Sequence, residues 1–363
     1  MAIFLLIFLL LLITYGVLID YYRRWWNGIT LFTTSNVPDV KISVVVAVRN
    51  EEKNIEKLLS LLLAQYYPKD FYEIIIVDDH STDNTYEVLR NFSQHHSINI
   101  IQLPEGITSK KKAIDRGVRA AVGELIVTTD ADCEMNEHWL ASFASFYRLT
   151  GAQFIAAPVN MDAGKSVCGV FQTLDFLGMQ GITGASVSHR FHTMCNGANL
   201  AYTKRAFIEV NGFEGVDEIP SGDDMLLMHK IFIAHPHHVH YMKSQEAIVT
   251  THPEPSWKDF FNQRIRWASK AVHFKDRKVF YTLVLTYLVN LCFIILAVAI
   301  VFDTRWLPFL LLLLLAKVLI EYPFVNAAAI FFRQQAIMKF FPVLQPLHIF
   351  YIVIAGWLGR FGS

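Results

Sequence analysis

The sequence predicts a membrane-bound α/β protein, in which a domain with a largely parallel sheet follows one apolar helix and precedes about three more. Composition is the first observation behind this prediction: the 363 residues are 53% hydrophobic and 18% charged, with no net charge. The second is that long apolar runs occur near both ends of the chain. The third is that strand and helix patterns alternate between them. Balanced charge offers no basic face, so we expect no nucleic-acid partner.

The first apolar run, residues 2–19, contains no charged side chain. About 20 such residues span the hydrocarbon core of a bilayer, so the run predicts a transmembrane helix. It has no basic segment before it and no small-residue cleavage site, and we therefore expect an uncleaved anchor over residues 1–22. Arg23 and Arg24 follow, which predicts that this end of the helix faces the cytoplasm.

Three further apolar runs predict a C-terminal membrane domain over residues 279–363. The runs are 280–302, 306–332 and 341–357. Basic residues gather before the first run and between the second and third, and these are Lys275, Arg277, Lys278, Arg333 and Lys339. Positive charge favours the cytoplasmic side, so the polar region between the anchors should also be cytoplasmic. We expect an integral protein of the cell membrane.

Lys317 and Glu321 interrupt the second of these runs. They are four residues apart, a spacing that lets two side chains pair on one face of a helix. A charge inside a membrane segment is costly unless it is paired or faces water. Two interpretations follow from the sequence: a buried structural pair, or a contact with lipid headgroups.

Alternating strand and helix patterns fill the start of the polar region. Residues 42–48 (ISVVVAV) form a β-branched run, residues 50–65 place apolar side chains at helical spacing with Asn50 available as a cap, and residues 73–79 (EIIIVDD) again favour a strand. The same alternation continues with a helix at 85–94, a strand at 98–104, a helix at 111–122 and a strand at 124–130. Ligands of such sheets bind beyond the carboxyl ends of the strands.

Acidic residues follow two of these predicted strands. Asp78 and Asp79 end the second, and Asp130 and Asp132 end the fourth in the sequence TTDADC. Two carboxylates one residue apart can hold a hard divalent ion and leave positions for phosphate oxygens. Aspartate is also common in turns, where it accepts hydrogen bonds from its own backbone. Both interpretations of the D-x-D sequence remain open at this point.

A second acidic group stands in the stretch SGDDMLLMHKIF, where a helix is expected to begin. Ser221 and Asp224 have the spacing of a capping box, so Asp224 would then only cap the helix. Alternatively, Asp223 or Asp224 faces a cleft and serves as a general base that accepts a proton from a hydroxyl. Upstream, Gly197 lies among small and amide residues, a composition that permits close approach to a ligand or forms a plain turn.

Taken in order, the segments VVVAVRNEEKNI, IIIVDDHSTDNT, KKKAIDRG, TTDADC, NGANLAYTKRAF, GDD and QRIRW resemble the inverting glycosyltransferases of family 2, which have the GT-A fold. The similarity is to the membrane-bound branch that includes cellulose, hyaluronan and chitin synthases and ceramide glucosyltransferase. It covers roughly residues 42–270. The resemblance implies a GT-A domain over 41–278, with a nucleotide-sugar-binding half at 41–135 and an acceptor-binding half at 136–278.

The resemblance also implies a role for each motif. The nucleotide sugar, with a uridine diphosphate sugar as the common case, would contact Asp78, Asp79, Lys110, Asp130, Asp132 and Arg266. Asp130 and Asp132 would hold the diphosphate through Mg²⁺ or Mn²⁺, and Asp224 would be the catalytic base. The acceptor would meet Asp223, Gln263 and Trp267. The chain departs from the family pattern at Asp115, where asparagine is usual, and in having GDD in place of TED.

Three hypotheses for the whole protein follow. The number of apolar runs is similar to that of ceramide glucosyltransferase, which favours a lipid or lipid-linked glycan as the acceptor. Extension of a polysaccharide is the alternative within the same family. A non-catalytic partner that binds a sugar nucleotide is an alternative of another class, and broken acidic motifs would favour it. Each acidic motif in this chain is filled by a chemically competent residue.

Overall fold

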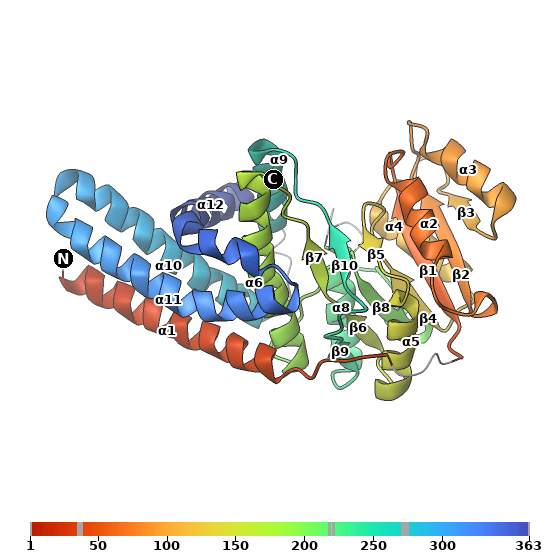
Figure 1. Cartoon of the computed structure of the whole chain (residues 1–363), viewed down its shortest axis with the longest axis horizontal. Helices are drawn as coiled ribbons and strands as arrows, with labels where there is room; N and C mark the ends of the chain where they lie inside the picture. Colours follow the sequence, from red (N-terminus) through yellow and green to blue (C-terminus); the bar gives the residue numbers. More distant parts are fainter. Residues whose placement is uncertain (1, 35–38, 217–218, 220–221, 270–275, 362–363) are drawn as a thin grey trace. The chain divides into compact units, whose positions relative to one another are not determined.

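A computed structural model describes residues 2–34, 39–216, 219, 222–269 and 276–361. The chain divides into two compact units. A helical unit comprises Met1–Ile29, Met161–His192 and Pro253–Ser363, and a sheet unit comprises Thr30–Asn160 and Thr193–His252. Each unit is thus assembled from segments that are distant in the sequence (Figure 1). The boundaries expected from the sequence, 1–22, 41–278 and 279–363, stay a prediction.

A seven-stranded mixed sheet forms the core of the sheet unit, in the order β3-β2-β1-β4-β8-β6-β9. Its strands are β1 (Ile42–Val48), β2 (Tyr72–Asp78), β3 (Asn99–Gln102), β4 (Leu125–Thr128), β6 (Phe154–Ala156), β8 (Leu200–Thr203) and β9 (Val239–Tyr241). The four strands β1 to β4 run parallel, whereas β8 is antiparallel to both of its neighbours. The expectation of a largely parallel sheet is confirmed. Strand β1 is buried along nearly all of its length, as expected for a strand covered on both faces.

Helices of the sheet unit follow most of these strands. They are α2 (Ile55–Leu63), the 3₁₀ turn η1 (Lys69–Phe71), α3 (Thr85–His95), α4 (Lys110–Ala120), α5 (Trp139–Thr150), α7 (Lys204–Glu209) and α8 (Asp223–Ala234). Helix α4 packs on β1 and β2, and α2 packs on α3. A small second sheet pairs β5 (Glu134–Met135), β10 (Val249–Thr251) and β7 (Val159–Met161) in that order.

The expected start of the first helix was wrong. Asn50 does not cap α2, which begins at Ile55; it instead has a left-handed backbone with φ of 58°. Its amide oxygen accepts a hydrogen bond from the Thr82 backbone N–H at 2.8 Å. Asparagine tolerates this backbone conformation because its short polar side chain bonds locally. The residues after β1 are therefore held to the loop after β2 rather than wound into the helix.

The helical unit contains six helices in the described part of the chain. They are α1 (Ala2–Gly28), α6 (Val167–Ser188), α9 (Trp257–Ser269), α10 (Arg277–Phe302), α11 (Leu307–Phe331) and α12 (Phe341–Phe361), with 3₁₀ turns η3 (Thr304–Trp306) and η4 (Gln335–Phe340). Four spans are long and apolar enough to cross a membrane: Ile3–Gly28, Arg277–Phe302, Thr304–Phe331 and Gln335–Gly359. One N-terminal and three C-terminal apolar helices were expected, and this expectation is confirmed.

Lys317 and Glu321 form a buried pair on α11, with exposed fractions of 0% and 5%. The lysine ammonium lies 2.5 Å from Glu321 Oε1 and donates to Gln345 Oε1 at 2.9 Å. The second carboxylate oxygen accepts from the Gln345 amide at 2.8 Å, and Tyr15 donates to the first at 2.6 Å. The hypothesis of a structural pair is therefore confirmed. The network joins α1, α11 and α12.

We expect Lys317→Met to lower the free energy of unfolding by about 3–5 kcal/mol, because it leaves the Glu321 carboxylate buried without its cation. Thermal unfolding in detergent, followed by circular dichroism, measures the loss. Arg305→Met is a matched control: this guanidinium pairs with Asp303 but is 86% exposed, so its removal should leave the melting temperature nearly unchanged.

The double variant Lys317→Met/Glu321→Leu tests whether the loss of stability in Lys317→Met comes from the unpaired carboxylate or from altered packing. Replacing both charges removes the uncompensated carboxylate, so the double variant should unfold at a higher temperature than Lys317→Met alone. A double variant that is less stable than the single variant would contradict the role given to the pair.

Candidate active site

The parallel strands bring the chain segments of the site together. Because β1, β2 and β4 are adjacent and parallel, their carboxyl ends lie at one edge of the sheet. Arg49 follows β1, Asp79 follows β2, and Asp130 comes two residues after β4. This edge is where α/β sheets bind ligands.

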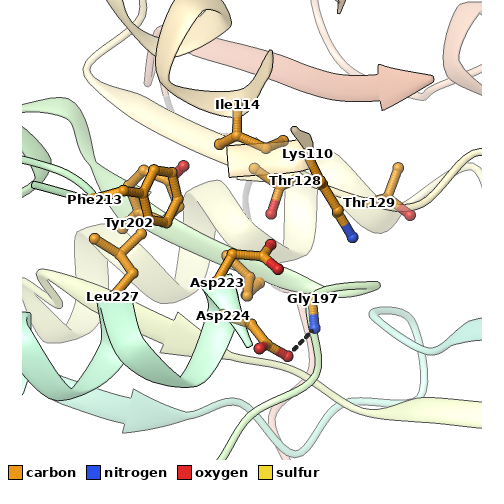
Figure 2. Close-up of a pocket in the computed structure, with 11 residues that line it drawn as sticks. Lys110, Ile114, Thr128, Thr129, Gly197, Tyr202, Phe213, Asp223, Asp224 and Leu227 are labelled. Carbon is orange, nitrogen blue, oxygen red and sulfur yellow. Dashed lines mark hydrogen bonds between the residues drawn. The ribbon is translucent and has the colours of Figure 1, made fainter. Parts of the chain in front are cut away.

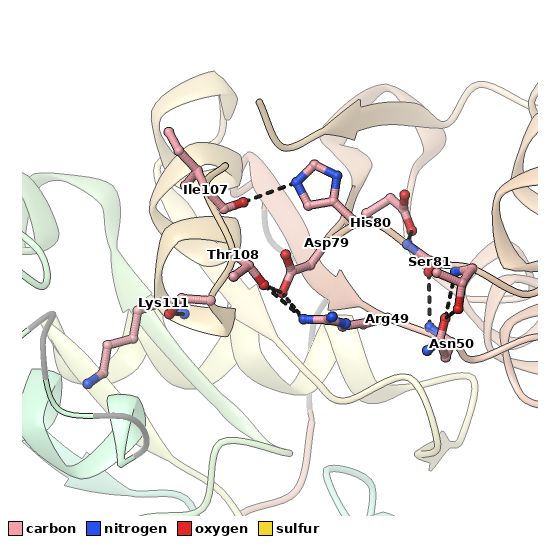
Figure 3. Close-up of polar contacts among 11 residues, drawn as sticks. Arg49, Asn50, Asp79, His80, Ser81, Ile107, Thr108 and Lys111 are labelled. Atoms are coloured by element: carbon pink, nitrogen blue, oxygen red, sulfur yellow. Dashed lines mark hydrogen bonds and ion pairs between the residues drawn. The ribbon is translucent and has the colours of Figure 1, made fainter. Parts of the chain in front are cut away.

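Asp79 is the centre of a polar cluster beyond β1 and β2 (Figure 3). Its side chain is buried, and its Oδ2 atom accepts a hydrogen bond from the Thr108 hydroxyl at 3.1 Å. Arg49 donates to the same hydroxyl at 2.8 Å and lies 3.6 Å from Oδ2. The other oxygen, Oδ1, is buried with no hydrogen-bond partner among the residues that the structure describes. A buried acceptor without a donor is energetically costly. The site therefore suits a ligand that donates an N–H or O–H to this oxygen.

The neighbouring residues shape this cluster. Asp78 is buried, and its Oδ1 atom accepts from the Ser81 backbone N–H at 3.3 Å, so one of its oxygens serves the turn. His80 has a positive φ of 56° and its Nε2 atom lies 3.1 Å from the Ile107 carbonyl oxygen. Sequence reasoning missed Arg49 and Thr108. The place of Arg49, directly after a parallel strand, was the available signal.

A pocket opens between α4 and the start of α8 (Figure 2). Most of its polar side chains come from strand ends and helix starts, and most of its other lining residues are apolar. The lining residues are Lys110, Ile114, Thr128, Thr129, Gly197, Leu200, Tyr202, Phe213, Asp223, Asp224 and Leu227. Three of the expected site residues, Lys110, Asp223 and Asp224, are thus brought together.

Lys110 carries a positive charge among these carboxylates. Its ammonium lies 2.5 Å from Asp130 Oδ1. Desolvation lowers the pKa of Lys110, but Asp130, Asp223 and Asp224 outweigh this effect and raise it above its usual value. The lysine therefore stays protonated. Asp115, the departure from the family pattern, instead pairs with Arg119 one turn further along α4, at 2.7 Å.

Asp224 is held by backbone groups at the start of α8. Its Oδ2 atom accepts from the Gly197 N–H at 2.8 Å, and its Oδ1 atom accepts from the Met225 N–H at 2.8 Å. Gly222, with φ of 79°, precedes the helix. The expected capping partner Ser221 lies outside the described residues. Asp224 is thus tied to the glycine-containing segment before β8, and its carboxylate faces the pocket (Figure 2).

The D-x-D carboxylates lie next to a third acidic side chain. Burial raises the pKa of Glu51, and the nearby charges of Asp132 and Asp130 raise it further. Asp132 is exposed and accepts from the Thr251 hydroxyl at 3.3 Å. No set of three or more metal-binding side chains is grouped at ligand spacing within the described ranges. Mg²⁺ commonly needs only one or two carboxylates together with substrate phosphates, so this donor set fits such an ion.

The QRIRW segment lies on α9, in the helical unit. Gln263, Arg266 and Trp267 are three and four residues apart, so they share one face of the helix. Arg266 is exposed and Trp267 is half-buried. The Gln263 amide donates to Glu254 Oε1 at 2.7 Å. These residues thus belong to a different unit from Lys110, Asp223 and Asp224.

Two family models match the chain. Residues 43–167 match "Glycosyl transferase family 2", and residues 125–337, more than half of the chain, match "Glycosyl transferase family group 2". Among curated proteins, the chain is similar to the glycosyltransferase AglE of Haloferax volcanii, with 29% identity over 188 residues, 52% of this chain and 58% of the relative.

A second relative comes from Methanococcus voltae and is described as a dolichyl N-acetyl-α-D-glucosaminyl phosphate 3-β-D-2,3-diacetamido-2,3-dideoxy-β-D-glucuronosyltransferase. It is 31% identical over 111 residues, which are 30% of this chain and 34% of the relative. The matches thus span less than two thirds of the length of these relatives.

Among solved structures, the chain is similar in fold to a mannosyltransferase of Pyrobaculum calidifontis, described as a complex with GDP-Man and Mn²⁺. The TM-score is 0.64 and the sequence identity 18%, over 99% of this chain and 98% of the other. At this identity the comparison supports the fold alone, and it confirms the expected GT-A architecture.

Replacement by alanine should affect stability differently at two glycines, which stand in the segments KKKAIDRG and NGANLAYTKRAF. A Cβ atom at Gly117 would lie 2.4 Å from Val45 Cγ1, so Gly117→Ala should lower the free energy of unfolding by about 1–3 kcal/mol. At Gly197 the nearest atoms, Asp224 Cβ and Lys110 Nζ, are 3.6 Å away, which leaves space for a methyl group inside the pocket. Gly197→Ala should change stability by less than about 0.5 kcal/mol. Equal melting temperatures for the two variants would contradict the expectation that only Gly197 has space for a methyl group.

Proposed function

We infer that this chain, which belongs to glycosyltransferase family 2, moves a sugar from a nucleotide diphosphate sugar to an acceptor hydroxyl with inversion at the anomeric carbon. The observation that carries this proposal is the pocket in which Lys110 faces Asp223 and Asp224 and pairs with the D-x-D residue Asp130. The acidic motifs are intact, which argues against a partner protein without catalytic activity.

The donor nucleotide would bind beyond β1 and β2. Asp79 has a buried oxygen without a donor in the described structure, and Arg49 stands beside it. An N–H or O–H of the nucleoside would satisfy that oxygen. Uridine diphosphate sugars are the first donors to test, because they are the common case in the family. A guanosine diphosphate sugar belongs beside them, since the solved fold neighbour is described as a complex with GDP-Man.

The diphosphate would lie beside the ion pair of Lys110 with the D-x-D residue Asp130. Asp130 and Asp132 are the residues that would hold Mg²⁺ or Mn²⁺, whose positive charge would offset the charge that grows on the leaving diphosphate. Lys110 supplies a fixed cation at the same place. By resemblance, Arg266 is assigned to the diphosphate as well.

Asp224 would be the general base. Backbone N–H groups of Gly197 and Met225 orient its carboxylate, so a hydroxyl that reaches the pocket finds a fixed acceptor for its proton. As the proton leaves, the hydroxyl oxygen attacks the anomeric carbon from the face opposite the diphosphate. The bond between the anomeric carbon and the diphosphate oxygen breaks in the same displacement, which inverts the configuration.

The acceptor that we propose is a lipid or a lipid-linked glycan at the cytoplasmic face of the membrane. Four apolar helices support membrane attachment. Arg23 and Arg24 at the end of α1, and Arg333 and Lys339 between α11 and α12, support a cytoplasmic sheet unit, because positive charge favours that side. Gln263, Asp223 and Trp267 would contact the acceptor.

The experiment for the acceptor uses membranes that contain the protein and a panel of labelled nucleotide sugars. Label that moves into an organic extract indicates a lipid acceptor, whereas label that stays with insoluble polymer would establish the alternative, a polysaccharide synthase. Membranes without the protein are the control. If neither fraction gains label with any donor, the proposed function is wrong.

We expect Asp224→Asn to lower the rate of transfer by about 10²- to 10⁴-fold, because the amide cannot accept the proton. Asp132→Ala should abolish detectable transfer. Both proteins should fold, with melting temperatures near that of the unchanged protein. Asp115→Asn is the matched control: it removes an aspartate of α4 that pairs with Arg119 outside the pocket, and it should keep activity. Turnover retained in Asp224→Asn would rule out the base.

We also expect transfer to need a divalent ion. Chelation with EDTA should stop it, and Mg²⁺ or Mn²⁺ should restore it, because the D-x-D carboxylates need a cation between them and the diphosphate. Isothermal titration of Mn²⁺ in the presence of uridine diphosphate provides a second measure. Binding should weaken at least tenfold in Asp132→Ala. Full activity in EDTA would contradict the assignment of these residues to a metal.

A further inference from the structure

Arg264, the second residue of the QRIRW segment, is buried inside the helical unit. Its side chain is 3% exposed, and its Nη2 atom lies 3.0 Å from Asp175 Oδ2 on α6, whose side chain is 4% exposed. Arg264 thus departs from the usual place of a cation beside apolar segments, which is the membrane surface.

The Asp175 carboxylate joins three helices. It accepts a hydrogen bond from the Tyr351 hydroxyl at 2.6 Å, and His348 Nε2 lies 3.4 Å from the same oxygen. Both residues are on α12, whereas Arg264 is on α9. Burial raises the pKa of Asp175, but Arg264, His348 and Tyr351 outweigh this and hold it below its usual value. The carboxylate therefore stays charged inside the unit.

Arg264 contacts both ends of the motif that the family resemblance assigns to the acceptor. Its guanidinium stands over the Trp267 ring, 4.2 Å from the ring centre, and over the Phe260 ring at 4.9 Å. Its Nη1 atom donates to Gln263 Oε1 at 2.9 Å. Gln263 in turn donates to Glu254, so its amide is held from both sides. One buried cation thus sets the places of the glutamine and the tryptophan together.

Stability alone does not account for such an arrangement. A buried ion pair recovers the cost of removing two charges from water only when its geometry is very good, and well-packed apolar residues are often as stable. The surroundings are suited to apolar packing, since Phe171, Phe260, Tyr351 and Ala355 form a buried cluster there. What apolar residues would not supply is a cation that lies over one ring and also donates a hydrogen bond to an amide.

We propose that Arg264, fixed by Asp175, is a positioning residue that holds Gln263 and Trp267 in the orientation needed to receive the acceptor. The proposal rests on the proposed function, in which these two residues meet the acceptor. Asp175 and Tyr351 act through Arg264. Lysine at position 264 would keep the charge but lacks the guanidinium, so it could not both cover the Trp267 ring and donate to Gln263 while it faces Asp175.

The first measurement reports orientation without any substrate. The full-length protein is labelled with 5-fluorotryptophan in detergent, and the Trp267 signal is assigned by its absence in Trp267→Phe. In Arg264→Lys the ¹⁹F signal of Trp267 should move and broaden, whereas those of the other tryptophans stay in place. Lys258→Met, an exposed change on the same helix, should leave it unmoved.

The second measurement reports the use of the acceptor. Membranes that carry each variant receive labelled UDP-glucose, or whichever nucleotide sugar of the panel the unchanged protein consumes. Label in the organic extract is compared with free sugar released to water. A poorly held acceptor site should lower the ratio of lipid product to free sugar at least fivefold in Arg264→Lys. A merely structural role would reduce both products in the same proportion.

Tyr351→Phe is the second variant, for use if Arg264→Lys does not fold. It removes one hydrogen bond to Asp175 and keeps the aromatic ring. It should shift the Trp267 signal in the same direction and lower the product ratio about twofold. An unmoved Trp267 signal in every variant that folds, or an unchanged product ratio, would overturn the proposal. If the unchanged protein consumes no donor, the proposed function fails by itself, and the ¹⁹F signal alone decides whether Arg264 positions Trp267.

Discussion

The charge balance around Lys110 is the interaction on which the candidate site depends. Parallel strands and the start of α8 bring Asp130, Asp223 and Asp224 near one ammonium group. Their negative charges hold the pKa of Lys110 above its usual value in spite of desolvation, so the ammonium stays charged. The fold thus places one fixed cation among three carboxylates that come from distant segments of the chain.

The helical unit shows the same principle in apolar surroundings. Lys317 pairs with Glu321 within α11, and Arg264 pairs with Asp175 between α9 and α6. In both places a hydroxyl from a further helix, Tyr15 or Tyr351, also donates to the carboxylate. Each network is directional, unlike hydrophobic packing, so it selects one rotation of each helix. This selection matters most for α9, which carries the motif.

Much of the sheet unit could be predicted from the sequence, because its signals are local. Strands β1 and β2 are buried on both faces and therefore appear as unbroken β-branched runs. The acidic residues come directly after β2 and two residues after β4, where the sequence pattern already showed the strands ending. Helix α6 was not predicted, since its glycine, serine and threonine residues obscure any apolar period. The burial of Arg264 was equally hidden. Its partner Asp175 lies far away in the chain, and a cation beside apolar segments ordinarily indicates a membrane surface.

The interleaving of the two units has a consequence for the order in which they form during synthesis. Both segments of the sheet unit, Thr30–Asn160 and Thr193–His252, emerge from the ribosome before α9 does. Domains generally fold as units and in order of synthesis, so the pocket around Asp224 can form early. Asp175 must wait for Tyr351, in the last helix, before its carboxylate has all of its partners. The helix that carries Trp267 therefore acquires its final surroundings only when α12 joins the unit, so a nascent chain would complete the pocket of the sheet unit before the surroundings of the QRIRW segment.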